Sequence, residues 1–202
     1  MNLTRRRFVT RTTLALAGGA ALESIKGADV DRSFPGEMPL IVSTWPFGKP
    51  ANDAALKILS GGGHILDAVE QGIWVPESDP KNSSVGLGGL PNGAGVVQLD
   101  ACIMSGPDHK AGSVAALEGI RHPISAARRV MEKTSHVMLV GEGARMFALE
   151  EGLESVDNDT GERYEAWRKK RAAAKTSRLE PVQKQKNHDT IALLVLGTDG
   201  NI

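Results

Sequence analysis

Residues 187–196 read Asn-His-Asp-Thr-Ile-Ala-Leu-Leu-Val-Leu, a polar segment that passes directly into an apolar one. Six consecutive apolar residues from 191 to 196 are typical of a short buried strand, and the Thr-Asp-Gly-Asn at 198–201 is typical of a turn. A buried strand needs a neighbour to satisfy its backbone hydrogen bonds. We therefore expect residues 191–196 to pair within the sheet of a folded domain, and we expect the 202-residue chain to be a fragment of a longer one.

Strands and helices alternate in the chain before this stretch. A short apolar, branched segment or a run with alternating apolar residues predicts strands at 40–44, 95–104, 113–117 and 136–140. Apolar residues at helical spacing predict helices from 50 to 60, from 65 to a stop at Pro76, from 123 to 131 and from 143 to 151. Glycines crowd residues 86–95, which predicts tight turns. This pattern favours an α/β fold.

The composition suits one ordinary globular domain, with 41% apolar and 24% charged residues. The 24 basic residues balance the 24 acidic ones, so there is no general electrostatic reason to expect nucleic acid or an anionic membrane as a partner. A single cysteine excludes an internal disulfide framework, and the five histidines are too scattered to suggest a zinc site. We expect no metal and no cofactor, and we expect Cys102 to be a buried small apolar residue.

The first 28 residues have the character of an export signal. Residues 4–10 read Thr-Arg-Arg-Arg-Phe-Val-Thr, and a short apolar stretch follows at 12–22. That stretch is too short to span a bilayer. Paired arginines before a modest apolar segment resemble a twin-arginine signal, which predicts export, in a bacterium to the periplasm, with no membrane attachment afterwards. A basic, frayed terminus is the alternative.

Residues 158–189 form a predicted charged linker. Between residues 162 and 187, nine lysines or arginines face three glutamates, which indicates a solvated helix leading into a loose segment. A nucleic-acid-binding arm is the alternative, but the run is short and lacks interleaved aromatic residues for stacking on bases. A polar linker that runs straight into a buried strand is the arrangement expected if the bond between them is to be cut.

Thr190 is the candidate nucleophile at that junction. If the peptide bond between Asp189 and Thr190 is broken, the hydroxyl and the free α-amine belong to one residue, and the amine can serve as the base for its own nucleophile. The reference pKa of such an amine, about 7.7–8.0, suits a general base near neutral pH. Self-cleavage would begin with attack of the Thr190 hydroxyl on the Asp189 carbonyl, with Asp189 or His188 accepting the proton. Alternatively, these three residues merely cap the start of a strand.

Several blocks, in order, resemble the glycosylasparaginase family of N-terminal-nucleophile hydrolases. They occupy most of residues 40–197, and their order is more specific than any one block alone. The blocks are Thr-Trp-Pro-Phe at 44–47, Gly-Gly at 61–62 with Leu-Asp-Ala-Val-Glu at 66–70, Ser-Val-Gly-Leu-Gly-Gly-Leu-Pro at 84–91, Leu-Asp-Ala at 99–101 with Ile-Met at 103–104, Thr-Ser-His-Val-Met-Leu-Val-Gly-Glu at 134–142, and His-Asp-Thr-Ile at 188–191.

The resemblance implies a four-layer αββα sandwich, here incomplete. Residues 39–157 would be the α-subunit part of the hydrolase domain and residues 190–202 the start of the β-subunit. It implies that Thr190 is nucleophile and base, and that Trp45 and Ser84 line the substrate pocket. The alternatives are a core aromatic residue for Trp45 and a turn residue for Ser84. A dimer of cleaved αβ heterodimers is also implied.

The implied reaction is hydrolysis of the β-aspartyl amide bond of N4-(β-N-acetylglucosaminyl)-L-asparagine through an acyl-enzyme on Thr190. An L-asparaginase or β-aspartyl-peptidase of the same family is the alternative within this class. The family's groups that grip the substrate and stabilise the oxyanion follow the nucleophile beyond residue 202, so the 202-residue chain by itself is expected to be inactive. An inactive exported remnant is the alternative from another class.

Overall fold

The computed structural model describes residues 38–156, 165–166, 168–169, 172–173 and 190–202. The predicted export signal at 1–28 and most of the predicted linker at 158–189 lie outside these residues, as do His188 and Asp189. The described residues between 165 and 173 are helical and exposed, in agreement with the solvated helix predicted for that stretch. In the described part of the chain, no helix is both long enough and apolar enough to cross a bilayer.

Two small sheets contain all the strands of the described residues. In the first, β1 (Leu40–Ser43) pairs antiparallel with β5 (Leu193–Leu196), with Leu40 opposite Leu196. The second has the order β2-β3-β4, with bounds Leu99–Ser105, Lys110–Leu117 and Met138–Val140. The antiparallel hairpin of β2 and β3 is the one predicted, and β4 lies parallel to β3. The prediction that residues 191–196 have a partner strand is confirmed, and that partner is β1.

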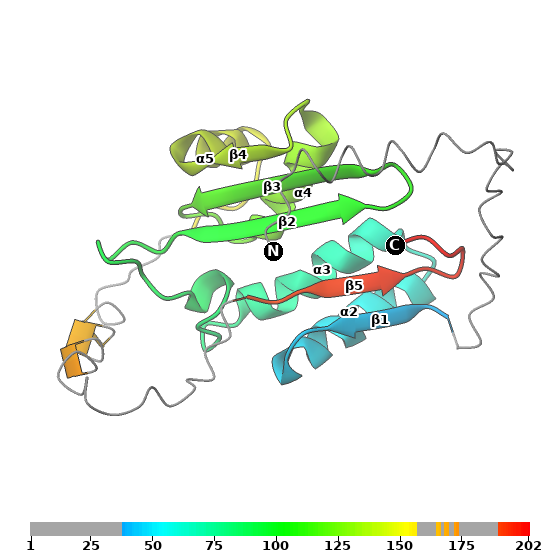
Figure 1. Ribbon diagram of the computed structural model, residues 1–202, viewed down its shortest axis with the longest axis horizontal. Coiled ribbons are helices and arrows are strands. Elements are labelled where there is room, and N and C mark those ends of the chain that lie inside the picture. The colour runs from blue at the N-terminus through cyan, green and yellow to red at the C-terminus, as the bar shows by residue number, and fades with distance from the viewer. Residues whose placement is uncertain (1–37, 157–164, 167, 170–171, 174–189) are drawn as a thin grey trace, which may run out of the picture. The chain divides into compact units, whose positions relative to one another are not determined.

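Helices cover one face of each sheet (Figure 1). The β1–β5 pair packs on α2 (Lys49–Ser60) and α3 (Ile65–Ser78), and the three-stranded sheet packs on α4 (Pro123–Lys133) and α5 (Gly141–Glu150). Two short 3-10 turns, η1 (Pro46–Gly48) and η2 (Gly86–Gly88), lie in the connections. The predicted helices are therefore all present. Pro76, expected to end the second of them, lies within the last turn of α3, and the helix ends two residues after it at Ser78.

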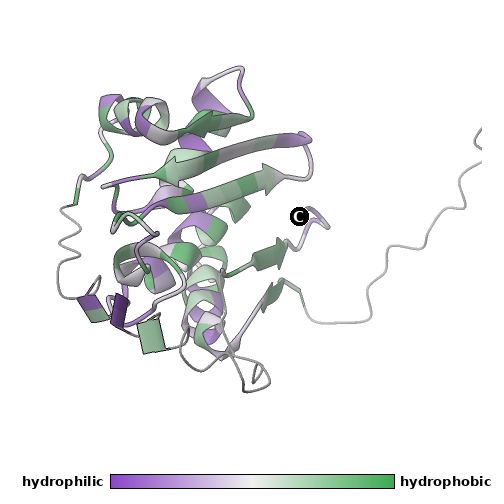
Figure 2. Ribbon diagram, turned by 60° about the vertical axis from the view of Figure 1, so that its left-hand side comes forward, coloured by the Kyte–Doolittle hydropathy of each residue, from purple (hydrophilic) through white to green (hydrophobic). Residues whose placement is uncertain are grey.

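One hydrophobic core joins the helices to both sheets. Its buried members come from α3, β2, β3, α4 and α5, and Leu193 of β5 packs against it. The glycine at 112 lets α4 approach β3, because a Cβ there would lie 2.2 Å from the Ala127 carbonyl oxygen. These contacts show an α/β fold with a helical layer against a sheet layer. The hydropathy colouring in Figure 2 shows the strand that leads to the C-terminus as strongly hydrophobic.

The faces of the sheets that do not meet the helices carry exposed apolar side chains. On the β1–β5 pair these are Leu40, Val42 and Leu194, and on the other sheet they are Met104, Met138 and Val140. We call these six residues the open faces. They alternate with inward-facing residues such as Ile41, Ile103 and Val195, as the pleat of a strand requires.

The expectation that Cys102 is buried is wrong, because its thiol is exposed. Cys102 follows Ala101 and precedes Ile103 in β2, and both of those residues pack toward the core. Alternate side chains in a strand point to opposite faces, so Cys102 points away from the helices together with Met104. An apolar run predicts a strand, but it does not show which of its positions face the core.

Candidate active site

Thr190 is exposed and stands just before a firmly held strand. Ile191 and Leu193 pack against the hydrophobic core, and Val195 is 2% exposed. Gly48 allows a close approach to the end of β1, because a Cβ there would lie 2.3 Å from Ser43 Oγ, and it would be in ordinary contact with Ile191 Cδ1 at 3.4 Å. The predicted nucleophile therefore lies at the open end of a strand whose alternate side chains are buried.

Trp45, two residues after the end of β1, reaches Thr190. Its indole Nε1–H donates a hydrogen bond of 2.9 Å to the backbone carbonyl oxygen of Thr190, across 145 residues of sequence. The side chain remains 44% exposed. Trp45 is therefore not a core aromatic residue, and the structure brings two of the predicted site residues together.

Thr44 holds the residue two positions after Thr190. Its backbone N–H donates to the Ala192 carbonyl oxygen at 3.0 Å, and its Oγ1 accepts from the Ala192 N–H at 3.0 Å. In the sequence, Thr44 belongs to one of the family blocks and has no predicted role of its own. A role for Thr44 could have been suspected from its hydroxyl group and from its place at the end of a predicted strand, where the chain turns at Trp45-Pro46.

Ser84 lies in the loop between α3 and η2 and is half-buried. Its backbone N–H donates to Asn82 Oδ1 at 3.0 Å, which holds this part of the loop in a local turn. The turn explains why a small polar residue suits this position, and a place in the substrate pocket stays a prediction. His188 and Asp189 lie outside the described residues, so their predicted part in cleavage also stays a prediction.

A buried polar cluster, which no local sequence pattern predicted, joins the end of α3 to the start of α4. Glu77 Oε1 accepts the backbone N–H of Ile124 at 3.0 Å, and Glu77 Oε2 lies 3.0 Å from His122 Nδ1. Trp74 stacks on the His122 ring with 5.1 Å between ring centres and donates to Ser125 Oγ at 2.8 Å. Burial raises the pKa of the Glu77 carboxyl, although the bonds from His122 and Ile124 oppose that effect.

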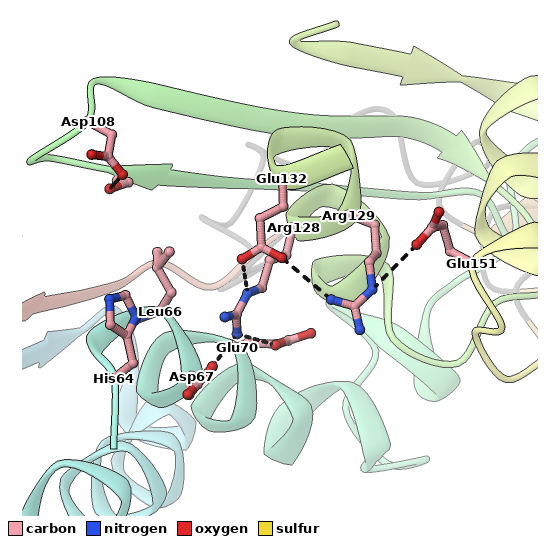
Figure 3. A network of polar contacts seen from close by, with 10 residues as sticks. His64, Leu66, Asp67, Glu70, Asp108, Arg128, Arg129, Glu132 and Glu151 are labelled. Carbon is pink, nitrogen blue, oxygen red and sulfur yellow. Dashed lines mark hydrogen bonds and ion pairs between the residues drawn. The ribbon is translucent and has the colours of Figure 1, made fainter. Parts of the chain in front are cut away.

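An arginine on α4 binds three carboxylates (Figure 3). Arg128, with 14% of its side chain exposed, lies 2.6 Å from Asp67 and 2.6 Å from Glu70 on α3, and 2.7 Å from Glu132 on its own helix. Burial alone would lower the pKa of Arg128, but the hydrogen bonds that its guanidinium donates to the carboxylates outweigh this effect and raise the pKa. Asp67 and Glu70 belong to one of the quoted family blocks, and here they tie two helices together.

An open hollow of about 820 Å³ lies at the other end of β5 and is lined by residues such as His64, Asp108 and Asp199. About seven residues of extended chain, at roughly 3.3 Å each, separate Thr198 from Thr190, so the hollow is not the candidate site. Within the described ranges, no three histidine, cysteine, aspartate or glutamate side chains are grouped so that they could hold a metal ion.

The α/β fold and an exposed threonine at the head of a buried strand fit the amidohydrolases that use a threonine nucleophile. Residues 40–202 match the protein family described as Asparaginase, and the chain belongs to that family. Within this family, the chain is similar to proteins named glycosylasparaginases.

Three relatives indicate the range of the family. The chain is 45% identical over 204 residues to an N(4)-(Beta-N-acetylglucosaminyl)-L-asparaginase of Elizabethkingia miricola, covering 100% of this chain and 59% of that protein. It is 48% identical over 105 residues to a plant-type L-asparaginase of Pyrococcus abyssi, covering 52% and 34% of the two chains. It is 35% identical over 156 residues to an isoaspartyl peptidase of Salmonella typhimurium, covering 74% and 50%. The chain thus spans 59% of the length of the first of these relatives and less of the others.

Proposed function

We propose that, in the whole protein, Thr190 is the nucleophile of a self-cleaving amidohydrolase that hydrolyses the β-aspartyl amide bond of N4-(β-N-acetylglucosaminyl)-L-asparagine. The observation that carries this proposal is the hydrogen bond from the Trp45 indole to the Thr190 carbonyl, because it unites two separate family blocks at one exposed hydroxyl residue. The similarity to the Elizabethkingia relative, which extends over the whole chain, supports the substrate.

Cleavage before Thr190 would create the free α-amine that serves as the catalytic base. The Thr190 hydroxyl attacks the Asp189 carbonyl carbon, the peptide nitrogen leaves as the Thr190 α-amine, and water hydrolyses the resulting ester to free the Asp189 carboxylate. Asp189 or His188 accepts the hydroxyl proton. The new amine then acts as the base for the same hydroxyl in each turnover.

Catalysis would follow the same pattern on the substrate. The Thr190 hydroxyl, deprotonated by its own amine, attacks the β-aspartyl carbonyl, and the glycosylamine leaves with a proton. Water then hydrolyses the acyl-enzyme and releases aspartate. Trp45 and Ser84 would line the pocket, and the exposed indole of Trp45 is available to pack against the substrate.

A plain asparagine or a β-aspartyl peptide is the second candidate substrate. The similarities to the plant-type L-asparaginase and to the isoaspartyl peptidase favour it, and its chemistry at Thr190 would be the same. Those similarities cover only 52% and 74% of the chain, whereas the glycosylasparaginase of Elizabethkingia miricola matches all of it. We therefore place the glycosylated substrate first.

The fold of the whole protein is proposed to be the four-layer αββα sandwich. The described residues supply one helical layer and one sheet layer, and a second sheet would cover the open faces, whose apolar side chains are otherwise left in water. Export through a twin-arginine-like signal and assembly into a dimer of αβ heterodimers complete the proposal, and both rest on the sequence resemblance.

Mass spectrometry of the whole protein tests the proposal. We expect a new N-terminus at Thr190 and release of aspartate from N4-(β-N-acetylglucosaminyl)-L-asparagine, with slower or no turnover of asparagine. Thr190→Ala should leave the chain intact and inactive, since it removes the attacking hydroxyl. Cutting that persisted in this variant would instead point to a separate protease, and an intact wild-type protein that hydrolyses the substrate would contradict the scheme. An intact, inactive wild-type protein is the outcome expected of an inactive remnant.

A further inference from the structure

The Thr44–Trp45 pair replaces regular strand pairing just where β5 begins. The β1–β5 ladder runs to Ser43 opposite Leu193, so the next pair would be Thr44 and Ala192. In a regular antiparallel pair of this kind, each residue would donate its N–H to the carbonyl of the other. Here Thr44 donates to the Ala192 carbonyl, but the Ala192 N–H is bound by the Thr44 hydroxyl instead of a backbone carbonyl.

The backbone turns sharply at Trp45, directly after the residue that makes this irregular hydrogen bond. Its φ of 66° and ψ of 152° place it in a region that glycine almost alone adopts. At this turn the chain leaves the strand toward η1, and the Ala192 N–H bonds to the Thr44 hydroxyl rather than to the Thr44 carbonyl. The same turn directs the indole to the Thr190 carbonyl. A strained residue kept at a candidate site is a reason to look for a function.

Three hydrogen bonds therefore hold both sides of Ile191, while its side chain packs against the core. Thr44 and Trp45 bind the carbonyl of Thr190 and both the N–H and the carbonyl of Ala192, and the side chain of Ile191 is held by the core. Thr190 therefore keeps little rotational freedom, except about its side-chain bonds and about the bond between its Cα and its nitrogen.

We propose that Thr44 and Trp45 are positioning residues for Thr190. The Thr44 hydroxyl and the Trp45 indole N–H fix the backbone that carries the nucleophile, and so they set the direction from which its hydroxyl approaches a carbonyl carbon. This inference rests on the proposed function of Thr190. It adds a role for Thr44, and it gives the Trp45 N–H a task separate from that of its ring in the pocket.

Two variants of Thr44 test the inference in the whole protein. Thr44→Val keeps the size of the side chain and removes the acceptor, whereas Thr44→Ser keeps the hydroxyl. A small misplacement of a reacting group slows chemistry by roughly 10- to 100-fold, so we expect Thr44→Val to lower kcat and the rate of cleavage before Thr190 by that order. KM should stay within about threefold, because the groups that touch the substrate are unchanged. Thr44→Ser should restore both rates to within about threefold of wild type.

Trp45→Phe provides a second variant if Thr44→Val folds poorly. It keeps an aromatic ring and loses the N–H, and we expect both rates to fall. Thr134→Val is the matched control: the Thr134 hydroxyl also bonds to backbone groups, the Val130 carbonyl and the His136 N–H, but at the end of α4. It should change stability without changing kcat or the cleavage rate.

Amide hydrogen exchange in the 202-residue chain gives a readout that needs no activity. Thr44→Val should speed exchange of the Ala192 N–H by about fivefold or more, because it loses its acceptor, and Thr44→Ser should not. If a folded Thr44→Val variant kept the wild-type kcat, the wild-type cleavage rate and the wild-type exchange rate of the Ala192 N–H, the inference would be overturned. The proposed function would still stand. If the wild-type whole protein neither cleaves nor hydrolyses, the proposed function fails, and the exchange result alone decides whether this pair fixes the segment.

Discussion

Glu77 is a carboxyl group with 3% of its surface exposed, and its two oxygens have separate partners. One accepts the Ile124 N–H at the start of α4, and the other meets the imidazole of His122. Burial raises the pKa of this carboxyl above its usual 4.5, so the folded protein keeps the proton to a higher pH than the unfolded chain does. The contribution of Glu77 to stability is therefore complete below its normal pKa and is lost as the pH rises through the raised value.

Glu77→Gln should isolate that effect. The amide copies the neutral acid, since it offers an oxygen to the Ile124 N–H and an NH₂ group to His122. Relative to wild type, we expect the variant to gain about 1–2 kcal/mol of unfolding free energy between pH 4.5 and pH 7.5. Urea unfolding at the two pH values measures the difference. Glu150→Gln, on the exposed side of α5, is the control and should show no such gain; an equal response of the two variants would contradict the prediction.

At the scale of the elements, Gly72 sets how closely α3 approaches α2 and β5. A Cβ at this position would lie 2.7 Å from Leu193 Cδ2, 3.0 Å from the Ala51 carbonyl oxygen and 3.3 Å from Ala55 Cβ. Ala51 and Ala55 are both fully buried. Small residues on both helices therefore allow close packing beneath the strand that carries Thr190.

Gly72→Ala should destabilise the chain even though alanine is the better helix former. Alanine gains about 1 kcal/mol over glycine in a helix interior, but overpacking against a buried backbone oxygen costs about 1–3 kcal/mol. We expect a net loss of about 1 kcal/mol in the free energy of unfolding. Gly143→Ala in α5 is the matched control, because a Cβ there meets nothing within 4 Å, and it should stabilise the chain slightly. Denaturant unfolding measures the free energy of unfolding of both variants. If Gly72→Ala were as stable as Gly143→Ala, the packing around residue 72 would be looser than the structure indicates.

The helical elements were predictable because their apolar periodicity and their glycine and proline boundaries are local signals. The hairpin of β2 and β3 was predictable for the same reason. The side of β2 on which Cys102 lies was not, because it depends on where α4 packs. The ion pairs of Arg128 likewise join two helices through residues 58 positions apart, and no local pattern announces such a contact.

For the whole molecule, the open faces matter because they leave six apolar side chains of the described residues exposed to water. Met104 on β2 is 61% exposed and Val140 on β4 is 56% exposed, and β3 lies between these two strands in the same sheet. Apolar patches of this kind promote association, so we expect the 202-residue chain to self-associate in sedimentation velocity experiments. The double variant Met104→Lys with Val140→Lys should reduce that association, because it places two charges on the patch.

Met146→Lys is the matched control, since Met146 is 55% exposed but lies on α5, and it should leave self-association unchanged. In the whole protein the double variant should instead lower the free energy of unfolding, because a covering second sheet would bury both charges without partners. A monomeric 202-residue chain, or a whole protein indifferent to the double variant, would count against the proposed four-layer arrangement.

The sequence by itself determined the α/β class, the position of most elements, the strand at 191–196 and the resemblance that pointed to Thr190. These conclusions follow from local periodicity and from ordered blocks, and both are present in the chain before it folds. Only the tertiary structure decided that Trp45 touches Thr190, that Thr44 binds Ala192, and that Asp67 and Glu70 serve a helix contact. Hydrogen bonds between residues far apart in sequence depend on how strands and helices pack, and that packing is set by the whole core.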